Sequence, residues 1–311
     1  MDYILGVDGG GTNTVAQIAD STGKLITENE SGPSNYKSVG IENAKKSINN
    51  SILGAIRNLK NSKKIVFKSS CFGLSGNDSD YDLNIYEEII FNNKIKKYLN
   101  PAKTIICNDT RIGLAAGSSS KNSIMIICGT GSNCYGINEK REEAKANGWD
   151  YILGDEGSGY NIGIKALRAI MRAYDGRGEK TLLSETILED LNIKDISELI
   201  GWAYSESFSK EKIASIAETV CRTAEMGDKI SIKILEEEAK EAVISVGAVA
   251  KKLNLTNKEF DLVLGGSVFM CEKYFKAIFI EKLKDKFPKI NFKPLTKKPV
   301  SGAIRLAIKN L

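Results

Sequence analysis

The segment GVDGGGTNT, Gly6–Thr14, places three consecutive glycines directly after the apolar run Tyr3–Val7. The residues that follow, Thr14–Ala19 and Leu25–Glu30, have the character of two further strands, and the polar residues between them form a turn. These features predict an antiparallel meander of three strands that is opened by a glycine-rich turn.

The same pattern returns later in the chain. The apolar run Ile124–Cys128 leads into Gly129-Thr130-Gly131-Ser132-Asn133, and Cys134–Ile137 has the character of a returning strand. A repeated strand, turn and strand indicates an internal duplication. Because strands alternate with helical segments in both halves, we predict an α/β fold with two similar halves.

Helices and further strands occupy the sequence around the two turns. Apolar residues recur at helical spacing over residues 41–59 and 158–174, and several amphipathic helices are expected between 181 and 254. Small and polar residues gather at Gly117–Asn122, which predicts the boundary between the halves there. Buried strands are expected at Ser70–Leu74, Thr104–Cys107 and Asp261–Leu264.

The composition is typical of a globular protein with two cores: 311 residues, 42% hydrophobic and 27% charged. The net charge of +5 comes from scattered lysines without interleaved aromatics, which favours a solvated surface over nucleic-acid binding. No apolar run approaches the roughly 20 residues of a membrane helix, and the first residues do not resemble a secretory signal. We therefore expect a cytoplasmic protein that binds neither nucleic acid nor membrane.

The sequence contains no histidine, which excludes histidine bases, Ser-His-Asp triads and histidine-ligated metals. Any general base must then be Asp, Glu, Lys, Tyr or Cys. The six cysteines include no Cys-x-x-Cys pair, so zinc spacing is missing. Since most of them lie in apolar runs, we expect buried thiols and no disulfide.

The first glycine turn has the chemistry of a phosphate site. Glycines allow close approach of the backbone to an anion, and the side chains of Thr12 and Asn13 add donors. An ordinary hairpin turn is the alternative, although it needs fewer glycines. The second turn indicates phosphate binding because it is the duplicate of the first. Two such turns could bind a triphosphate from both sides.

Two aspartates follow predicted strands. Asp8 could hold Mg²⁺ beside the phosphates, usually through water. Asp109, after the strand Thr104–Cys107, could accept a proton from an alcohol, or it could simply cap the next helix. A protein without histidine needs such a carboxylate if it activates an alcohol.

Two later segments carry weaker indications. Trp149 lies in a glycine-rich loop and could stack on a sugar, with Asp155 and Glu156 accepting hydroxyl hydrogen bonds. The alternatives are a core tryptophan and acids that favour a helix N-terminus. Gly265 and Gly266 follow a late strand and could let a flat adenine or ribose lie against the backbone.

Taken together, these segments resemble the N-acetylglucosamine kinase and BadF/BadG/BcrA/BcrD ATPase family, within the actin, hexokinase and heat-shock-chaperone superfamily. The resemblance spans nearly the whole chain and is carried by eight motifs: GVDGGGTNT at Gly6–Thr14, GPSN at Gly32–Asn35, GLSGND at Gly73–Asp78, NDT at Asn108–Thr110, CGTGSN at Cys128–Asn133, GW with GDEGS within Gly148–Ser158, GGS at Gly265–Ser267, and PVSGAIRLA at Pro299–Ala307.

The resemblance implies two ribonuclease-H-like (actin-like ATPase) domains with an interdomain cleft. The first would comprise residues 1–117 and a returning C-terminal helix at about 300–311, and the second residues 118–299 with helical insertions. It implies ATP and Mg²⁺ as cofactors, Asp109 as the base that acts on a sugar hydroxyl, and Asp8 near the metal. Phosphates and adenosine would contact Gly10, Gly11, Thr12, Asn13, Thr130, Gly265 and Gly266, and the sugar would contact Asn35, Gly131, Ser132, Asn133, Trp149 and Asp155.

The activity that the resemblance implies is phosphorylation of a small-molecule amino sugar at its 6-hydroxyl, in cell-wall amino-sugar salvage. N-acetylglucosamine is the first substrate to consider, N-acetylmuramate the second and glucosamine the third. A homodimer is considered as the oligomeric state. The competing class is a non-kinase ATPase, either a sugar sensor or an activator of an acyl-CoA reductase or dehydratase. Such activators carry bridging cysteines for an iron–sulfur cluster; here Cys128 and Cys134 flank the second turn, but no DIGGQD-like segment accompanies them.

Overall fold

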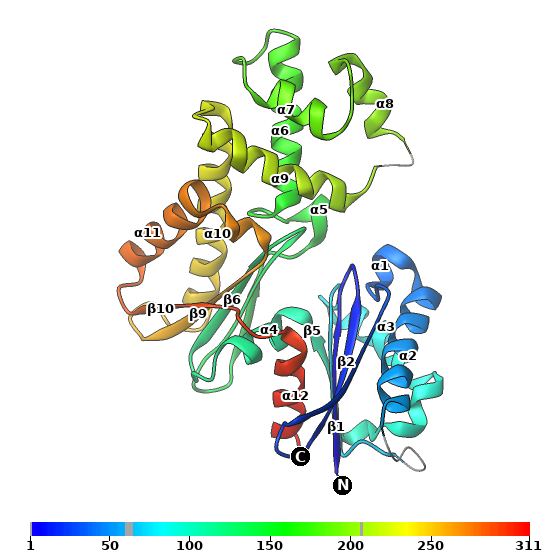
Figure 1. Cartoon of the computed structure of the whole chain (residues 1–311). Coiled ribbons are helices and arrows are strands. Elements are labelled where there is room, and N and C mark those ends of the chain that lie inside the picture. The colour runs from blue at the N-terminus through cyan, green and yellow to red at the C-terminus, as the bar shows by residue number, and fades with distance from the viewer. Residues whose placement is uncertain (1, 60–64, 206–207) are drawn as a thin grey trace. The chain divides into compact units, whose positions relative to one another are not determined.

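The computed structural model describes residues 2–59, 65–205 and 208–311 (Figure 1). The chain divides into two compact units, Met1–Met125 with Lys293–Leu311, and Ile126–Phe292. The boundary between the units falls within strand β6 (Ser123–Cys128), just after the predicted boundary segment Gly117–Asn122. The last helix, α12 (Pro299–Lys309), belongs to the unit formed by the N-terminal residues.

The first unit is built on a five-stranded sheet in the order β3-β2-β1-β4-β5. Strands β1 and β2 are antiparallel, as are β2 and β3, which confirms the predicted meander. Strand β4 is parallel to both β1 and β5, so these three strands end at the same edge. The strands are β1 (Tyr3–Gly9), β2 (Thr14–Asp20), β3 (Leu25–Ser31), β4 (Ser69–Leu74) and β5 (Thr104–Asn108).

Both faces of this sheet are covered, because residues that alternate along each strand enter two different cores. Leu5, Val7 and Ile18 pack with helices α2 and α3, whereas Ile4 and Ala19 pack with α4 and α12. The helices of this unit are α1 (Tyr36–Val39), α2 (Ile41–Arg57), α3 (Asp80–Phe91), α4 (Asp109–Gly117) and α12, with short 3₁₀ turns at Lys94–Tyr98 and Pro101–Lys103.

The second unit repeats the plan of the first. Its sheet has the order β10-β9-β6-β7-β8, so that its first strand is again central, with the second and third on one side and the fourth and fifth on the other. The identical strand order confirms that the two glycine turns belong to duplicated α/β halves. Besides β6, its strands are β7 (Ser132–Ile137), β8 (Glu143–Ala146), β9 (Phe260–Gly265) and β10 (Ile290–Pro294).

Most of the helical insertions lie between β8 and β9. Helix α10 is fully buried along the row that includes Leu235, Ala239 and Val246, and it packs on α6, α9 and α11. The helices are α5 (Asp150–Leu153), α6 (Gly159–Tyr174), α7 (Leu183–Asp190), α8 (Leu199–Ala203), α9 (Lys210–Glu225), α10 (Lys229–Lys252) and α11 (Ala277–Lys286), with short turns at Ile196–Glu198, Ser267–Met270 and Glu272–Lys276.

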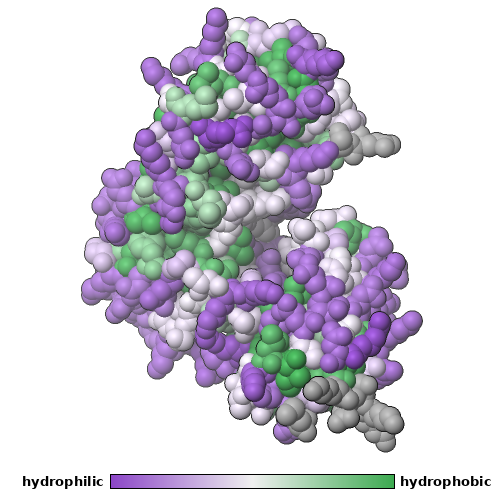
Figure 2. Space-filling model, in the orientation of Figure 1, coloured by the Kyte–Doolittle hydropathy of each residue, from purple (hydrophilic) through white to green (hydrophobic). Residues whose placement is uncertain are grey.

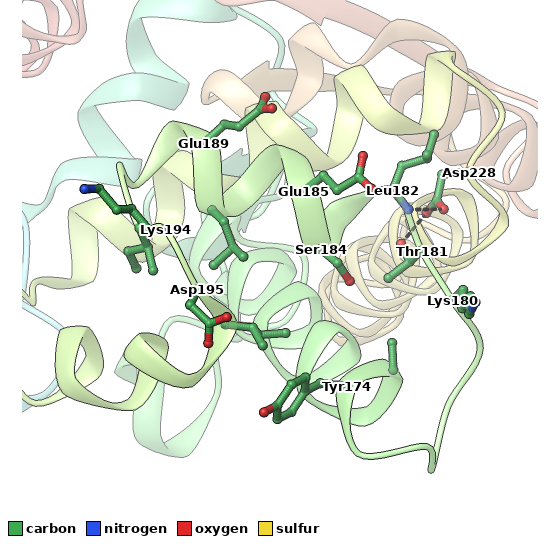
Figure 3. A pocket seen from close by; sticks show the side chains of 14 residues that line it. Tyr174, Lys180, Thr181, Leu182, Ser184, Glu185, Glu189, Lys194, Asp195 and Asp228 are labelled. Carbon is green, nitrogen blue, oxygen red and sulfur yellow. Dashed lines mark hydrogen bonds between the residues drawn. The ribbon is translucent and has the colours of Figure 1, made fainter.

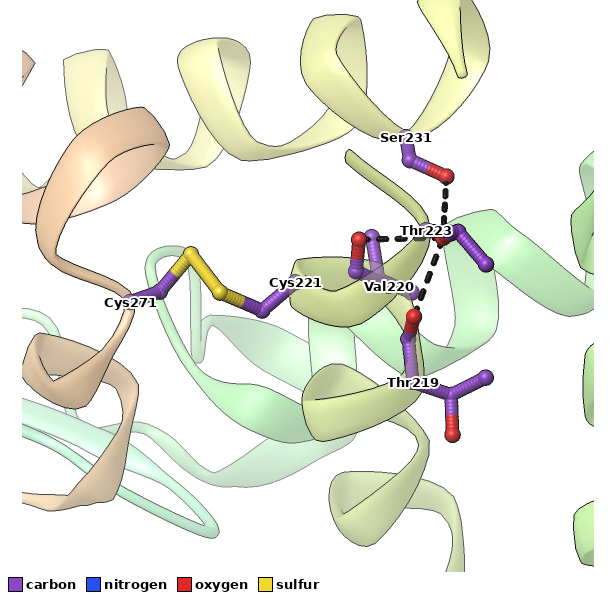
Figure 4. Close-up of a disulfide and its surroundings, with 6 residues drawn as sticks. All are labelled: Thr219, Val220, Cys221, Thr223, Ser231 and Cys271. Carbon is purple, nitrogen blue, oxygen red and sulfur yellow. Dashed lines mark hydrogen bonds between the residues drawn. A yellow bond between two sulfur atoms is a disulfide. The ribbon is translucent and has the colours of Figure 1, made fainter. Parts of the chain in front are cut away.

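The expectation that no disulfide forms is wrong. Cys221 on α9 is joined to Cys271, which precedes the turn Glu272–Lys276, at a Cα–Cα distance of 5.8 Å (Figure 4). The other four cysteines are buried free thiols, as predicted. The pair is separated by 50 positions in the chain, so its proximity is set by the packing of the second unit and by no local spacing.

Hydrophilic residues predominate on the face of the molecule drawn in Figure 2, in keeping with a chain of which 27% is charged. Among the residues that the structure describes, none of the helices combines the length and the hydrophobicity that crossing a membrane requires.

Candidate functional site

The first glycine turn closes the β1–β2 hairpin and is held tightly on one side. The N–H of Gly10 donates to the carbonyl of Asn13 at 2.8 Å, and the N–H of Ser75 donates to the carbonyl of Gly9 at 2.8 Å. A Cβ on Gly9 would lie only 2.3 Å from the Ser34 hydroxyl, whereas one on Gly11 would meet nothing within 4 Å. The turn therefore packs against the protein at Gly9 and presents the exposed residues 11–13 outward.

Asp8 and Asp109 lie at the same edge of this sheet. In the register of the strands, Asp8 is beside Gly73 of β4, and Gly73 is beside Cys107 near the end of β5. Partial burial, together with the nearby charge of Asp109, raises the pKa of Asp8 to about 7. The parallel strands thus bring both predicted acids to the glycine turn.

The cap of α4 is supplied by Asn108, whose side-chain oxygen accepts the N–H of Thr110 at 2.9 Å. The amide of Asn108 also donates to Asp78 at 3.0 Å, which fixes the end of β5 to the GLSGND loop. Asp109 is the first residue of the helix and does not serve as its cap. The alternative that Asp109 is merely a capping residue is therefore wrong.

Asn35 belongs to the same end of the unit. It caps the short helix α1 by accepting the N–H of Lys37 at 3.1 Å, and a Cβ on Gly76 would lie 2.6 Å from its side-chain oxygen. The hydroxyl of Tyr86 donates to the carbonyl of Ser75 at 2.7 Å and to that of Ser34 at 3.2 Å. These contacts hold the GPSN and GLSGND loops together beside the glycine turn.

In the second unit, the loop before α6 is bonded to the second glycine turn. The N–H of Ser132 donates to the carboxylate of Asp155 at 2.9 Å, and the N–H of Gly159 donates to the carbonyl of Gly129 at 2.7 Å. Burial raises the pKa of Asp155, although the Lys210 ammonium, 2.8 Å from its second oxygen, acts in the opposite direction. Asp155 is thus fixed between the turn and the start of α9.

Trp149 is 54% exposed, so the alternative of a core tryptophan is wrong. Its loop contains three residues with positive φ: Asn147 and Gly148 before the tryptophan and Asp150 after it. A Cβ on Gly148 would lie 2.7 Å from the side chain of Asn133, and Asn147 donates to the Ser132 hydroxyl at 3.3 Å. The loop that carries the exposed ring therefore lies beside Ser132 and Asn133 at the second glycine turn.

A cavity of about 700 Å³ opens next to this turn, within the second unit. Gly129 and Thr130 line it on one side, and helix α9 lines the other through Ala214, Ala217 and Glu218. Ser267 and Cys271 contribute from the segment after β9, while Gly265 and Gly266 are not part of the lining. Gly266 lies behind the turn, since a Cβ there would be 2.2 Å from the carbonyl oxygen of Cys128.

A second cavity, of about 760 Å³, lies among α6, α7 and the turn Ile196–Glu198 and contains none of the predicted site residues (Figure 3). Asp228 at its wall accepts hydrogen bonds from the Thr181 hydroxyl at 2.9 Å and from the N–H of Leu182 at 3.0 Å. Asp228 is thus engaged in holding the start of α7. The cavity beside the glycine turn is the better candidate for a ligand site, because the predicted residue Thr130 lines it.

Sequence reasoning missed two residues next to the predicted ones. Lys210 bonds both Asp150, at 2.6 Å, and Asp155, and nothing in the local sequence distinguishes it from the many surface lysines. Glu238 on α10 is fully buried and accepts the N–H of Gly157 at 2.6 Å. Its place on the apolar row of α10 could have been found from the helical period.

The sequence profile of the BadF/BadG/BcrA/BcrD ATPase family matches residues 5–307. The chain belongs to this family. Membership covers both glycine turns and the helix α12 that returns to the first unit, so it applies to the duplicated architecture as a whole.

Two relatives align over 99% of the chain and 98% of their own lengths. The N-acetylmuramic acid/N-acetylglucosamine kinase of Clostridium acetobutylicum is 36% identical over 307 residues. The N-acetyl-D-glucosamine kinase of Dictyostelium discoideum is 33% identical over 317 residues. Among solved structures, a candidate N-acetylglucosamine kinase from Chromobacterium violaceum has a TM-score of 0.76 and 20% identity, with 99% of each chain covered, which establishes a shared fold.

Proposed function

We propose that this member of the family transfers the γ-phosphoryl group of ATP to the 6-hydroxyl of an N-acetylhexosamine. N-acetylglucosamine is the first acceptor and N-acetylmuramate a second, in keeping with the names of the two relatives. The proposal rests above all on Asp109, a carboxylate beside the glycine turn that does not cap its helix and is close enough to Asp8 to raise its pKa.

The reaction needs a base for the alcohol and charge stabilisation for the phosphoryl group. Asp109 would take the proton of the 6-hydroxyl as the sugar oxygen bonds to the γ-phosphorus and the bond to the β–γ bridging oxygen breaks, releasing ADP. The turn residues Gly10–Asn13 and Thr130 would bind the phosphates, and the cavity beside Thr130 would take the adenosine. Gly265 and Gly266 would support the wall behind it.

Mg²⁺ fits the carboxyl of Asp8, whose pKa of about 7 reflects the burial of a charge near a second carboxylate. A divalent cation would supply the missing countercharge there and neutralise the phosphates. Asp8 would hold the cation through water. Asp109 would face the sugar as the base and would not be a metal ligand.

Six residues are proposed to bind the sugar. Asn35 lies beside Gly76 in the first unit. Gly131, Ser132, Asn133, Asp155 and the loop that carries Trp149 are in contact with one another in the second unit. An exposed tryptophan beside hydrogen-bonding groups is suited to a sugar, because the ring takes its apolar face and the polar groups take its hydroxyls.

The alternative function, activation of an acyl-CoA reductase or dehydratase, is disfavoured because the two cysteines that it would need are buried. Cys128 and Cys134 are both fully buried, and burial raises the pKa of each thiol. A cluster shared between subunits needs accessible thiolates. Neither cysteine could supply one without rearrangement of the second sheet.

The decisive experiment is Asp109→Asn, assayed by coupled ADP release with glucosamine, N-acetylglucosamine, N-acetylmuramate and N-acetylmannosamine. Loss of a general base typically costs about 10²- to 10⁴-fold in kcat, and ATP binding should persist. Asp80→Asn is the matched control, because Asp80 is also an acid in the first turn of a helix but is exposed and distant from the glycine turn in sequence. Wild-type kcat in Asp109→Asn would reject the base.

A further inference from the structure

Glu238 is a carboxylate at the centre of the second unit, with 0% of its surface exposed. One oxygen accepts the backbone N–H of Gly157 at 2.6 Å. The side-chain amide of Asn161 donates to both oxygens, at 2.9 and 3.1 Å, and the ammonium of Lys165 lies 2.8 Å away. A long helix, α10, thereby holds the loop before α6 through a single side chain.

The loop that Glu238 holds carries the contacts to the second glycine turn. Asp155, two residues before Gly157, accepts the N–H of Ser132, and Gly159, two residues after it, donates to the carbonyl of Gly129. Gly157 has φ +83°, and a Cβ there would lie 3.2 Å from Ala242 of the same helix. The point at which Glu238 holds the backbone is therefore midway between the two bonds that place Asp155 and the turn.

Stability alone is a poor reason for a charge at this position. Taking a carboxylate out of water is costly, and a buried ion pair often contributes no more than well-packed apolar residues of the same volume. The neighbours of Glu238 on the buried row of α10 are apolar, Leu235, Ala239 and Ala242. The charged carboxylate instead fixes the positions of the groups around it, because it accepts hydrogen bonds from several donors.

We propose that Glu238 is a positioning residue of the phosphotransfer site, which acts through Gly157 to set the place of Asp155 against the second glycine turn. The inference rests on the proposed function, in which Asp155 binds the sugar. Glu238 touches neither substrate, so its effect should be largest on sugar binding and on kcat, and smaller on nucleotide binding.

The test is Glu238→Gln in the full-length chain. Glutamine keeps the volume and one acceptor, but its amide group would point donors at Asn161 and Lys165, which are themselves donors. We expect the Kd of N-acetylglucosamine to rise about tenfold and kcat to fall about tenfold, because small displacements of binding groups are costly in rate. The Kd of ATP should change less than threefold.

Two readouts separate positioning from general destabilisation. Sugar binding is followed by the fluorescence of Trp149 in a Trp202→Phe background. Hydrogen exchange of the segment 154–158 reports the anchored loop without any substrate. Val246→Ala is the matched control, because Val246 is fully buried on the same helix and does not bond the loop. Glu237→Gln removes the neighbouring carboxylate that bonds Lys165 at 3.0 Å and should leave sugar binding unchanged.

Faster exchange at 154–158 with weaker sugar binding in Glu238→Gln, but not in Val246→Ala, supports the proposal. Unchanged exchange, or an equal loss of sugar affinity in Val246→Ala, overturns it. Should Glu238→Gln fail to fold, Asn161→Ala removes one of the donors and must show the same changes to a smaller degree. A wild type that releases no ADP with any amino sugar would reject the proposed function, and the exchange result would still decide whether Glu238 anchors the loop.

Discussion

Gly266→Ala tests how closely the segment after β9 supports the second glycine turn. Gly266 has φ +99° and ψ 154°, a conformation that is essentially restricted to glycine, and an added Cβ would lie 2.2 Å from the carbonyl oxygen of Cys128 and 2.7 Å from the nitrogen of Gly129. The backbone conformation alone costs about 1–3 kcal/mol. Overpacking against backbone that cannot rotate away costs about 1–3 kcal/mol more.

The total predicted for Gly266→Ala is about 2–6 kcal/mol, which for a unit of this size corresponds to a fall in Tm of about 4–24 °C. Thermal unfolding followed by far-ultraviolet circular dichroism measures this loss. Isothermal titration with ATP measures the second effect, a fall in affinity of at least about tenfold, because the displaced atoms belong to the turn that is proposed to bind the phosphates.

Gly40→Ala is the matched control for Gly266→Ala. Gly40 has nearly the same backbone conformation, φ 78° and ψ 159°, but a Cβ there would meet nothing within 4 Å. It should show only the backbone cost of about 1–3 kcal/mol, with unchanged ATP affinity. If Gly266→Ala is no more destabilising than Gly40→Ala and binds ATP normally, the close approach to Cys128 is not what this glycine is needed for.

Three further predictions concern the acids, the disulfide and the tryptophan. The pKa of Asp8 is raised from 3.8 to about 7 in the folded protein, so its contribution to stability is fully present below pH 3.8 and is lost as the pH rises from there through about 7. The Tm of the wild type, measured without metal, should therefore fall relative to that of Asp8→Asn between these two pH values. Parallel curves of Tm against pH for the two proteins would contradict the shift. Cys221→Ser should destabilise the protein by about 4 kcal/mol, from the chain entropy of a loop of 50 residues, as measured by urea unfolding; a reductant that leaves the wild-type midpoint unchanged would argue against the bond. Trp149→Ala should weaken sugar binding about tenfold, through loss of ring contact, with nucleotide affinity preserved; titrations that show the reverse would reject its place in the sugar site.

The elements next to the glycine turns were the most predictable part of the fold. Each turn follows a short apolar strand, and the strand order of the two sheets confirms the duplication that the repeated pattern predicted. Local chemistry decides such elements, because a run of glycines ends a strand and polar residues mark the next turn. The helical insertions between β8 and β9 were predicted only as a group, since amphipathic periods do not specify the order of packing.

The contacts that the sequence did not predict join residues far apart in the chain. Cys221 and Cys271 are brought together by the packing of α9 on the segment after β9, which no spacing rule describes. Glu238 lies in a run of three glutamates that, read alone, indicates a solvated surface. The roles of Asp109, Asp155 and the turn residues stay predictions, to be tested by the variants described above.

Helix α12 gives the order of synthesis a consequence for folding. Ala303, Ile304 and Ala307 complete the core on one face of the first sheet, and Arg305 donates to the carbonyl of Ala115 at 2.7 Å. The strands of the first sheet precede α12 in the chain, so the apolar surface that α12 covers stays exposed until α12 has been translated. A premature stop that removed α12 would leave the second unit, residues 126–292, intact in sequence and would instead expose the face of the first sheet that α12 covers, on the unit that carries Asp8 and Asp109.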